Sequence, residues 1–151
     1  MKVVKESAHV QNSLEGAWKV ISDSRNWAEA MPGFIAFEQV DELVSLWTIK
    51  VEAGMFSREV EFEVTQTECI EPSAMHFSLK AKKEGIVGNA TYHGTQVNEE
   101  QGELNFQLEM MGKGMMAGMI DSLLEKTLPE QCQILKENLV KQLEASDEVK
   151  N

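Results

Sequence analysis

Tyr92 and His93 are the neighbouring side chains in this sequence that best suit acid–base chemistry. They lie in a stretch over 86–97 that alternates like a strand, so the two side chains point to opposite faces of the sheet. Tyr92 shares its face with Gly88 and Gly94, and a tyrosine inside an apolar pocket can orient a ligand or act as a general acid or base. Such catalysis needs a second positioned group, and the sequence offers none. A structural hydrogen bond is therefore favoured, and no catalytic residue is predicted.

The three histidines, His9, His76 and His93, do not form a metal motif. None has a second histidine, a cysteine or an acid at the spacing that metal ligands need. The sequence also contains neither a glycine-rich phosphate loop nor a nucleophile elbow. It therefore predicts no metal and no cofactor.

Glu59, Glu61 and Glu63 alternate along the clearest strand pattern in the chain, which spans 56–67. This period places them on the solvent face, where alternate charges usually serve solvation and protect an edge. Arg58 has the opposite parity and lies among inward-facing apolar residues. A buried arginine needs a partner, which a ligand carboxylate can supply, but exposure at the strand end is the favoured interpretation.

The composition is that of one soluble domain. The chain has 151 residues, of which 42% are hydrophobic and 26% are charged, and a domain of this size can bury a core without disulfides or metals. Its formal net charge of −11 opposes binding to nucleic acid. No run approaches the ~20 apolar residues of a membrane span. Cys69 and Cys132 fit no metal pattern, and the first ten residues lack the apolar stretch of a secretory signal, so a reducing cytoplasm is expected.

The hydrophobic period changes in a clear order along the chain. A weak strand over 3–10 leads to a helix with Asn12 as its N-cap and Glu15 completing a capping box, and a second short helix follows. Strand-like runs then extend from 35 to 110. They are short and linked by turns, so the sheet is expected to be antiparallel. From Met115 the period is helical, and Pro129 is expected to kink or restart this last helix.

These elements predict an α+β fold, in which a curved antiparallel sheet of about seven strands wraps on a long C-terminal helix and two short helices follow the first strand. A single domain is expected over 1–145, with a frayed tail over 146–151. A sheet this wide is broader than one helix can fill, so the space between them is either packed or left as a pocket. Five of the nine methionines fall between 110 and 119, and methionine suits surfaces that adapt to varied apolar partners. Ordinary core is the favoured interpretation of this cluster, and a cavity wall is the alternative.

The first third of the chain carries a set of recognisable residues: His9–Val10, Glu15, Trp18, Ile21, Asp23, Trp27 and the turn over Met31–Phe34. This set resembles the opening of the START-like polyketide cyclase superfamily. The Pro32–Gly33 turn, the Gly112–Gly114 segment and the long final helix are most similar to the CoxG branch, which is associated with carbon monoxide dehydrogenase. The resemblance spans roughly 3–143 and implies a helix-grip fold that binds a hydrophobic molecule between sheet and helix. Some relatives are enzymes, some carry ligands and some serve a partner enzyme.

The predicted function is non-catalytic binding of a hydrophobic or amphipathic small molecule or lipid. Its pocket is expected to be lined by Met31, Phe34, Trp47, Phe62, Phe77, Tyr92, Phe106, Met110, Met115, Met119 and Leu123. Two alternatives stay open: a polyketide cyclase or dehydratase that uses Tyr92 or His93, and an accessory subunit of a carbon monoxide dehydrogenase-like oxidoreductase. No nucleic acid and no integral membrane span are expected, and the protein is expected to be a cytoplasmic monomer or homodimer.

Overall fold

A computed structural model describes residues 1–53 and 55–150, with the backbone alone described for residues 53 and 146–150. The elements are β1 (Lys2–Val10), α1 (Leu14–Ile21), α2 (Ser24–Ala30), β2 (Phe34–Gln39), β3 (Val44–Ala53), β4 (Phe56–Ile70), β5 (Ala74–Ala81), β6 (Ile86–Asn98), β7 (Gln101–Gly112) and α3 (Ala117–Lys150). All strand pairs are antiparallel, and the order across the sheet is β1-β7-β6-β5-β4-β3-β2. The predicted fold class is confirmed. The frayed tail over 146–151 stays a prediction, because Asn151 and the side chains of 146–150 lie outside the described residues.

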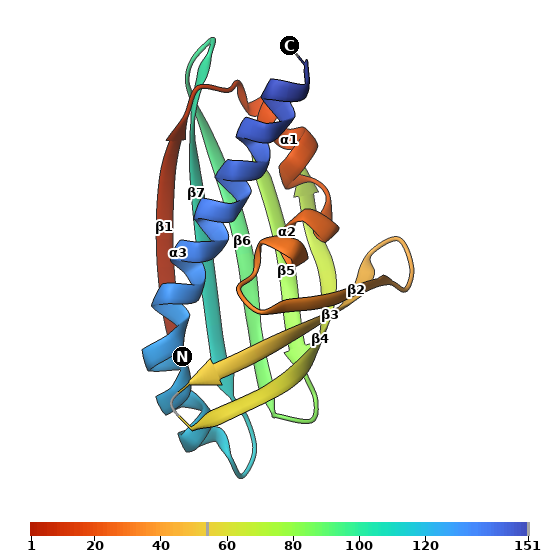
Figure 1. Cartoon of the computed structure of the whole chain (residues 1–151), viewed down its shortest axis with the longest axis vertical. Coiled ribbons are helices and arrows are strands. Elements are labelled where there is room, and N and C mark those ends of the chain that lie inside the picture. The colour runs from red at the N-terminus through yellow and green to blue at the C-terminus, as the bar shows by residue number, and fades with distance from the viewer. Residues whose placement is uncertain (54, 151) are drawn as a thin grey trace.

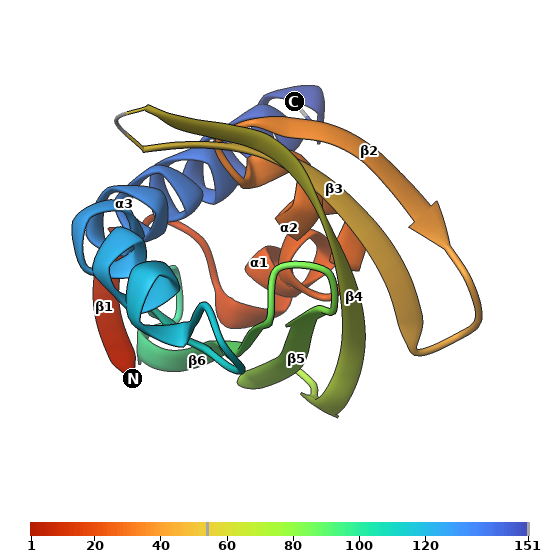
Figure 2. The ribbon, with the colours of Figure 1, turned by 90° about the horizontal axis from the view of Figure 1, so that it is seen from below.

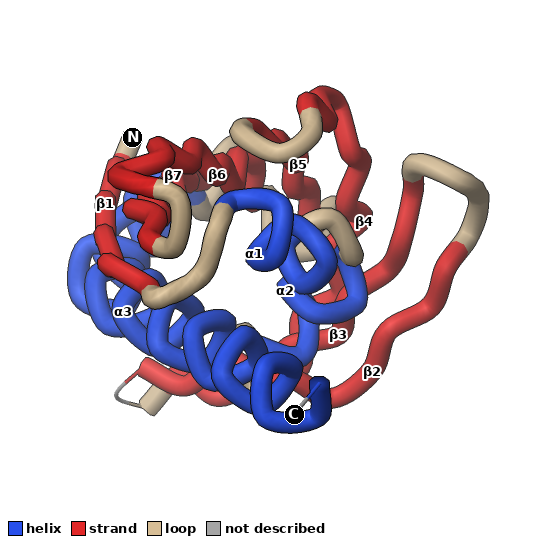
Figure 3. The backbone as a smooth tube through the Cα atoms, turned by 90° about the horizontal axis from the view of Figure 1, so that it is seen from above, coloured by secondary structure: helices blue, strands red, loops and turns tan. Residues whose placement is uncertain are grey.

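The sheet curves around the three helices (Figures 1 and 2). Helix α3 runs diagonally across the open side of the curve, next to β1 and β7, while α1 and α2 lie inside one end of it. The view from above shows α1 and α2 between α3 and the strands β4 and β5 (Figure 3). That end of the curve is therefore filled by helices, and the other end is covered by α3 alone.

Strict alternation in the central strands produces the core. Every second side chain of β7 is buried, from Leu104 to Met110, and the residues between them are only partly buried. Strands β5 and β6 follow the same pattern, with Phe77 and Tyr92 inward. A period of two places one set of side chains on the concave face, where the helices exclude water.

Helix α1 begins one residue later than the sequence predicts. Ser13, not Asn12, is the N-cap, and its hydroxyl accepts a hydrogen bond from the Gly16 amide at 3.1 Å. The predicted capping box on Asn12 and Glu15 is therefore wrong. Both Asn12 and Ser13 are good N-cap residues, and the choice between them depends on how the chain leaves β1.

Pro129 lies inside α3 and does not end it. Of the two alternatives expected at Pro129, a kink or a restart, the restart is wrong, because α3 continues through Pro129 as one helix with one apolar stripe on the sheet. Pro129 and Glu125 are both exposed, so the Glu125 carbonyl that loses its amide partner faces water. The buried stripe of α3 comprises Ile120, Leu124, Leu128, Cys132, Leu135, Leu139 and Leu143.

The turn between α2 and β2 depends on glycine. Gly33 has φ of 81°, and a Cβ there would overlap the carbonyl oxygen of Lys50. The Gly33 carbonyl accepts a hydrogen bond from the Lys50 amide at 2.7 Å. Only glycine adopts this conformation without strain, so the turn brings the chain directly against β3.

Candidate ligand cavity

An apolar cavity lies under the N-terminal half of α3, between the helix and the concave face of the sheet. Its volume is about 40 Å³, and a water molecule needs about 10–15 Å³ measured in the same way. It is lined by Met31, Ile49, Val51, Phe56, Val60, Phe62, Ile86, Met110, Ile120, Leu123, Leu124, Thr127 and Gln131. The lining is almost wholly hydrocarbon and sulfur, so the cavity suits an apolar group of a few atoms as it stands.

A smaller gap of about 10 Å³ continues this space toward the centre of the molecule. The two share Met31, Ile49, Phe62 and Met110. Two of these shared residues are methionines, whose flexible side chains re-pack more readily than those of branched residues. A larger apolar ligand could therefore be accommodated by movement of these two methionine side chains.

A polar groove of about 330 Å³ adjoins the cavity between α3 and the segment formed by the α2–β2 turn and β3. It is lined by Pro32, Gly33, Lys50, Glu52, Thr127, Glu130, Gln131 and Ile134. Thr127 and Gln131 line both spaces, so the groove leads toward the cavity past one helical turn of α3. Neither Thr127 nor Gln131 was among the residues expected to line the pocket.

The wall opposite α3 is a two-stranded ribbon. Among the described residues, 51–53 of β3 pair only with 56–58 of β4, because β2 pairs no further than Ile49. Residues 59–62 of β4 continue the pairing along 47–50 of β3, and 56–62 have no partner on their other side, because β5 pairs no further than Glu63. In Figure 1 this ribbon reaches across the lower part of α3. A two-stranded ribbon is only marginally stable by itself, so this wall depends on its contacts with α3 and with the turn between β5 and β6.

Arg58 makes the contact with that turn. Its guanidinium lies 3.1 Å from the carboxylate of Glu84, whose side chain is only 4% exposed, whereas that of Arg58 is 51% exposed. The ligand carboxylate considered for Arg58 is thus replaced by a carboxylate of the protein. Glu59, Glu61 and Glu63 line a separate groove with lysines of the β5–β6 region, so they do not face the cavity.

The structure brings together five of the predicted lining residues. Met31, Phe62 and Met110 line both apolar spaces, Leu123 lines the larger one and Trp47 the smaller one. Phe34 is only partly buried and packs at the border of the core. Whether any of these residues contacts a ligand stays a prediction.

Phe77, Tyr92 and Phe106 are inward as predicted but lie in solid core. Trp27 of α2 packs edge-on against Phe77 and Phe106, with ring centroids 5.2 and 5.7 Å away, and Tyr92 packs against Phe106 at 5.6 Å. The indole nitrogen of Trp27 donates a hydrogen bond to the Ile21 carbonyl at 2.7 Å. These rings fill the end of the curve that the sequence left open as a pocket.

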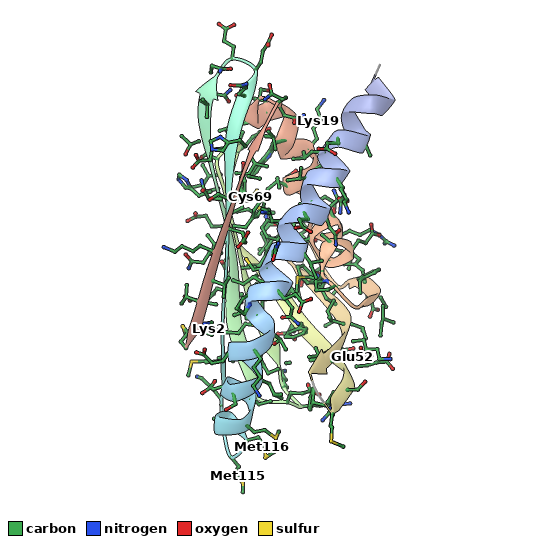
Figure 4. The ribbon with its side chains drawn as sticks, turned by 60° about the vertical axis from the view of Figure 1, so that its left-hand side comes forward. Lys2, Lys19, Glu52, Cys69, Met115 and Met116 are labelled. Atoms are coloured by element: carbon green, nitrogen blue, oxygen red, sulfur yellow. The ribbon has the colours of Figure 1, made fainter. Side chains whose placement is uncertain are left out.

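Met115 and Met119 were expected in the lining but lie on the surface. Met115 and Met55 are fully exposed, and Met116 and Met119 are about half exposed. Figure 4 shows Met115 and Met116 at the end of the molecule where α3 begins, toward the same end as Glu52 of β3. The methionines between 110 and 119 therefore divide. Met110 is buried and lines the cavity, whereas Met115, Met116 and Met119 form an exposed apolar end beside it.

Tyr92 has the unusual combination of complete burial and an unpaired hydroxyl. The side chain is 1% exposed, and the hydroxyl has no hydrogen-bond partner among the described residues. Gly94 leaves the space that the phenol occupies, since a Cβ there would overlap the hydroxyl oxygen. Burial raises the pKa of Tyr92 to about 12. His93 is exposed. Among the described residues, the Tyr92 hydroxyl therefore lacks the second positioned group that acid–base catalysis needs.

Two further features limit the chemistry of the described residues. No group of three histidine, cysteine, aspartate or glutamate side chains within the described ranges is placed to hold a metal ion. None of the helices over 1–53 and 55–150 combines the length and apolar character that crossing a membrane requires. The apolar cavity and the adjoining groove are thus the best-formed candidate site.

The curved sheet, the long helix across its open side and the apolar space between them define a helix-grip fold. A conserved protein from Geobacillus kaustophilus superposes with a TM-score of 0.80 at 12% identity, covering 96% of this chain and 97% of that one. A START superfamily protein from Mycobacterium smegmatis gives 0.71 at 13% identity, covering 95% and 97%. A point mutant of norcoclaurine synthase from Thalictrum flavum gives 0.70 at 13% identity, covering 97% and 96%. Identities this low show a shared fold.

The family follows from the sequence match. The model of the CoxG family, named for a subunit of carbon monoxide dehydrogenase, matches residues 7–144. This range is nearly the whole chain, so the protein belongs to that family. The superfamily and branch suggested by the sequence motifs are thereby confirmed. A comparison with curated protein sequences finds no significant match.

Proposed function

We propose that the protein binds a hydrophobic or amphipathic small molecule, such as a lipid, beneath α3 without transforming it. The observation that carries the proposal is the apolar cavity joined to a polar groove at Thr127 and Gln131. Buried apolar surface supplies affinity, and a few polar groups at the border supply orientation. In this proposal the protein acts in the cytoplasm, a reducing compartment in which its two free cysteines would stay as thiols.

The cavity of about 40 Å³ is smaller than a lipid chain, so binding requires that the cavity enlarge. The ribbon of β3 and β4 is the wall that can move, because neither of its outer edges is paired within 51–53 and 56–62. Met31 and Met110 can re-pack at the inner end. The free energy of burying the ligand offsets the cost of this rearrangement, as in any binding that selects a less populated conformation.

Native mass spectrometry of protein purified from cells tests whether it carries an apolar molecule, and titration with a fluorescent fatty-acid analogue measures affinity. Leu123→Phe adds bulk to the cavity lining and is expected to weaken binding at least tenfold. Leu43→Phe is the matched control, because Leu43 is 52% exposed and lies outside the cavity lining. The proposal fails if the wild type neither carries a molecule nor saturates with the probe, or if both variants bind like the wild type.

A second candidate function is delivery of the ligand to a partner oxidoreductase of the carbon monoxide dehydrogenase type. The family name suggests such a partner, and the exposed methionines beside the cavity favour it, since exposed apolar clusters often mark interaction surfaces. Met115→Glu with Met116→Glu should abolish co-purification with that enzyme and leave ligand binding intact. Val97→Glu is the control, because Val97 is about as exposed as Met116 but lies near the opposite end of β6, away from Ile86 at the cavity. Equal co-purification of all variants would exclude a role for these methionines.

The polyketide cyclase or dehydratase alternative rests on Tyr92. The side chain faces inward, but the structure places its hydroxyl in solid core beside Gly94 and Leu14 and not in the lining of either apolar space. A substrate in the cavity would therefore not reach it. If the wild type cyclised a model polyketide and Tyr92→Phe did not, the cyclase alternative would be favoured over non-catalytic binding.

A further inference from the structure

The cavity and the groove meet at two side chains of α3, Thr127 and Gln131, one turn apart on the helix. They are also the only polar residues in the cavity lining, within the part of the chain that the structure describes. A molecule that occupied both spaces would have its apolar part in the cavity and its polar end in the groove, and it would cross between them beside Thr127 and Gln131. The two side chains are therefore placed to select the polar end.

The two side chains differ in their unused hydrogen-bonding capacity. The hydroxyl of Thr127 already donates a hydrogen bond to the Leu123 carbonyl at 3.0 Å. No hydrogen bond joins the side-chain amide of Gln131 to another described residue. Gln131 is partly buried, and its amide has donors and an acceptor available. Gln131 is thus the group with free hydrogen-bonding capacity at the border.

The charges around the groove disfavour an anionic end. Lys50 is already paired with Glu52, with the nitrogen 3.3 Å from the carboxylate oxygen. Glu130 adds a further negative charge to the lining, so one lysine and two glutamates leave a net charge of −1. A carboxylate or phosphate end would meet this charge, whereas a neutral carbonyl or hydroxyl would meet only dipoles.

We infer that the ligand is an amphipathic molecule with a neutral polar end, a ketone, ester or hydroxyl oxygen, which accepts a hydrogen bond from the Gln131 amide in the groove. Its apolar part lies in the cavity and reaches toward Met31 and Met110. Gln131 acts as a specificity-determining residue that orients the ligand. The inference rests on the proposed function, since it assigns the polar end of the ligand held in the same cavity.

The experiment compares probes that share one alkyl chain and differ only at the end: a methyl ketone, an alcohol, a carboxylate and an amine, each below its micelle concentration. The wild type should bind the ketone and the alcohol most tightly. Gln131→Leu should weaken both by about 2–12-fold, because one neutral hydrogen bond contributes about 0.5–1.5 kcal/mol. Gln133→Leu is the matched control, since Gln133 is exposed on the same helix and donates to Glu137 instead.

Gln131→Glu separates the hydrogen bond from side-chain volume. It keeps the shape of the side chain and removes the donors, so ketone binding should fall while alcohol binding, which can donate to the new carboxylate, should persist. A wild type that prefers the carboxylate or amine, that binds all four probes equally, or that is unaffected by Gln131→Leu overturns the inference and leaves the proposed function standing. If no probe binds at all, the proposed function is wrong and the inference falls with it.

Discussion

Removing the hydroxyl of Tyr92 should stabilise the protein. The hydroxyl is buried without a partner among the described residues, and an unpaired buried polar group costs about 1–3 kcal/mol. Tyr92→Phe leaves the ring packed against Phe106 and removes only the oxygen beside Gly94. The free energy of unfolding at neutral pH should therefore rise by about 1–2 kcal/mol once the small void left behind is counted.

The same residue should make stability fall at high pH. Burial raises the pKa of Tyr92 from 10.0 to about 12 in the folded protein, so the folded state favours the protonated, neutral phenol. The stability that comes from keeping the phenol neutral is fully present below pH 10 and is lost as the pH rises from 10 through about 12. Each pKa unit corresponds to about 1.4 kcal/mol, so the full loss is on the order of 3 kcal/mol. The difference between wild type and Tyr92→Phe isolates the tyrosine from every other group in the chain.

Tyr92 is the only tyrosine in the chain, which makes the assay direct. The near-ultraviolet absorbance of tyrosinate in the folded protein reports its pKa without any assignment, and urea unfolding at a series of pH values gives the stability difference. A tyrosinate transition near pH 10 in folded protein would show that the hydroxyl is solvated. A loss of stability in Tyr92→Phe would show that it has a partner, such as a buried water. Either result refutes the reasoning.

Three further outcomes are expected. In the native protein, a disulfide reagent should modify the exposed Cys69 and spare the buried Cys132. The pKa of Cys132 is raised to about 11, mainly by burial and secondarily by the charge of Glu6. Counting the reactive thiols before and after denaturation checks this. Pro129→Ala should raise the free energy of unfolding by about 1–2 kcal/mol in urea, because a helix-interior proline costs about 3 kcal/mol and its restriction of the unfolded chain returns part of that. Arg58→Met should speed both association and release of an apolar probe in stopped-flow measurements, since it unties the ribbon from the β5–β6 turn.

The strands and their faces were predictable because their signal is local. Along β7 the residues from Leu104 to Met110 alternate without exception, and a strand with one buried face must show that period. The order of the elements then limited the topology to an antiparallel sheet with one covering helix. The N-cap of α1 was not fixed by such a signal, because Asn12 and Ser13 are both good caps.

The position of the cavity was less predictable than its chemistry. Inward parity identified Phe77 and Phe106 as well as Phe62, but it could not show that Trp27 fills the space before the first two. Met119 was expected to line the pocket, yet it is 45% exposed, and it is the next residue, Ile120, that is buried. Packing between segments distant in sequence decides which part of the concave face is filled. The hydrophobic period of one strand or helix carries no information about that packing.

The two walls of the cavity differ in how firmly they are held. Helix α3 is tied to α2 by the amides of Asn138 and Gln142, which donate to the carbonyls of Ala30 and Asn26 at 2.8 and 3.0 Å. At its start Asp121 accepts a hydrogen bond from the Gly112 amide at 2.7 Å. The ribbon of 51–53 and 56–62 has no paired strand on its outer edges within the described residues. Local opening draws on the least stabilised segments, so, given the proposed function, we expect a ligand to enter under α3 by displacing the ribbon while the helix stays in place.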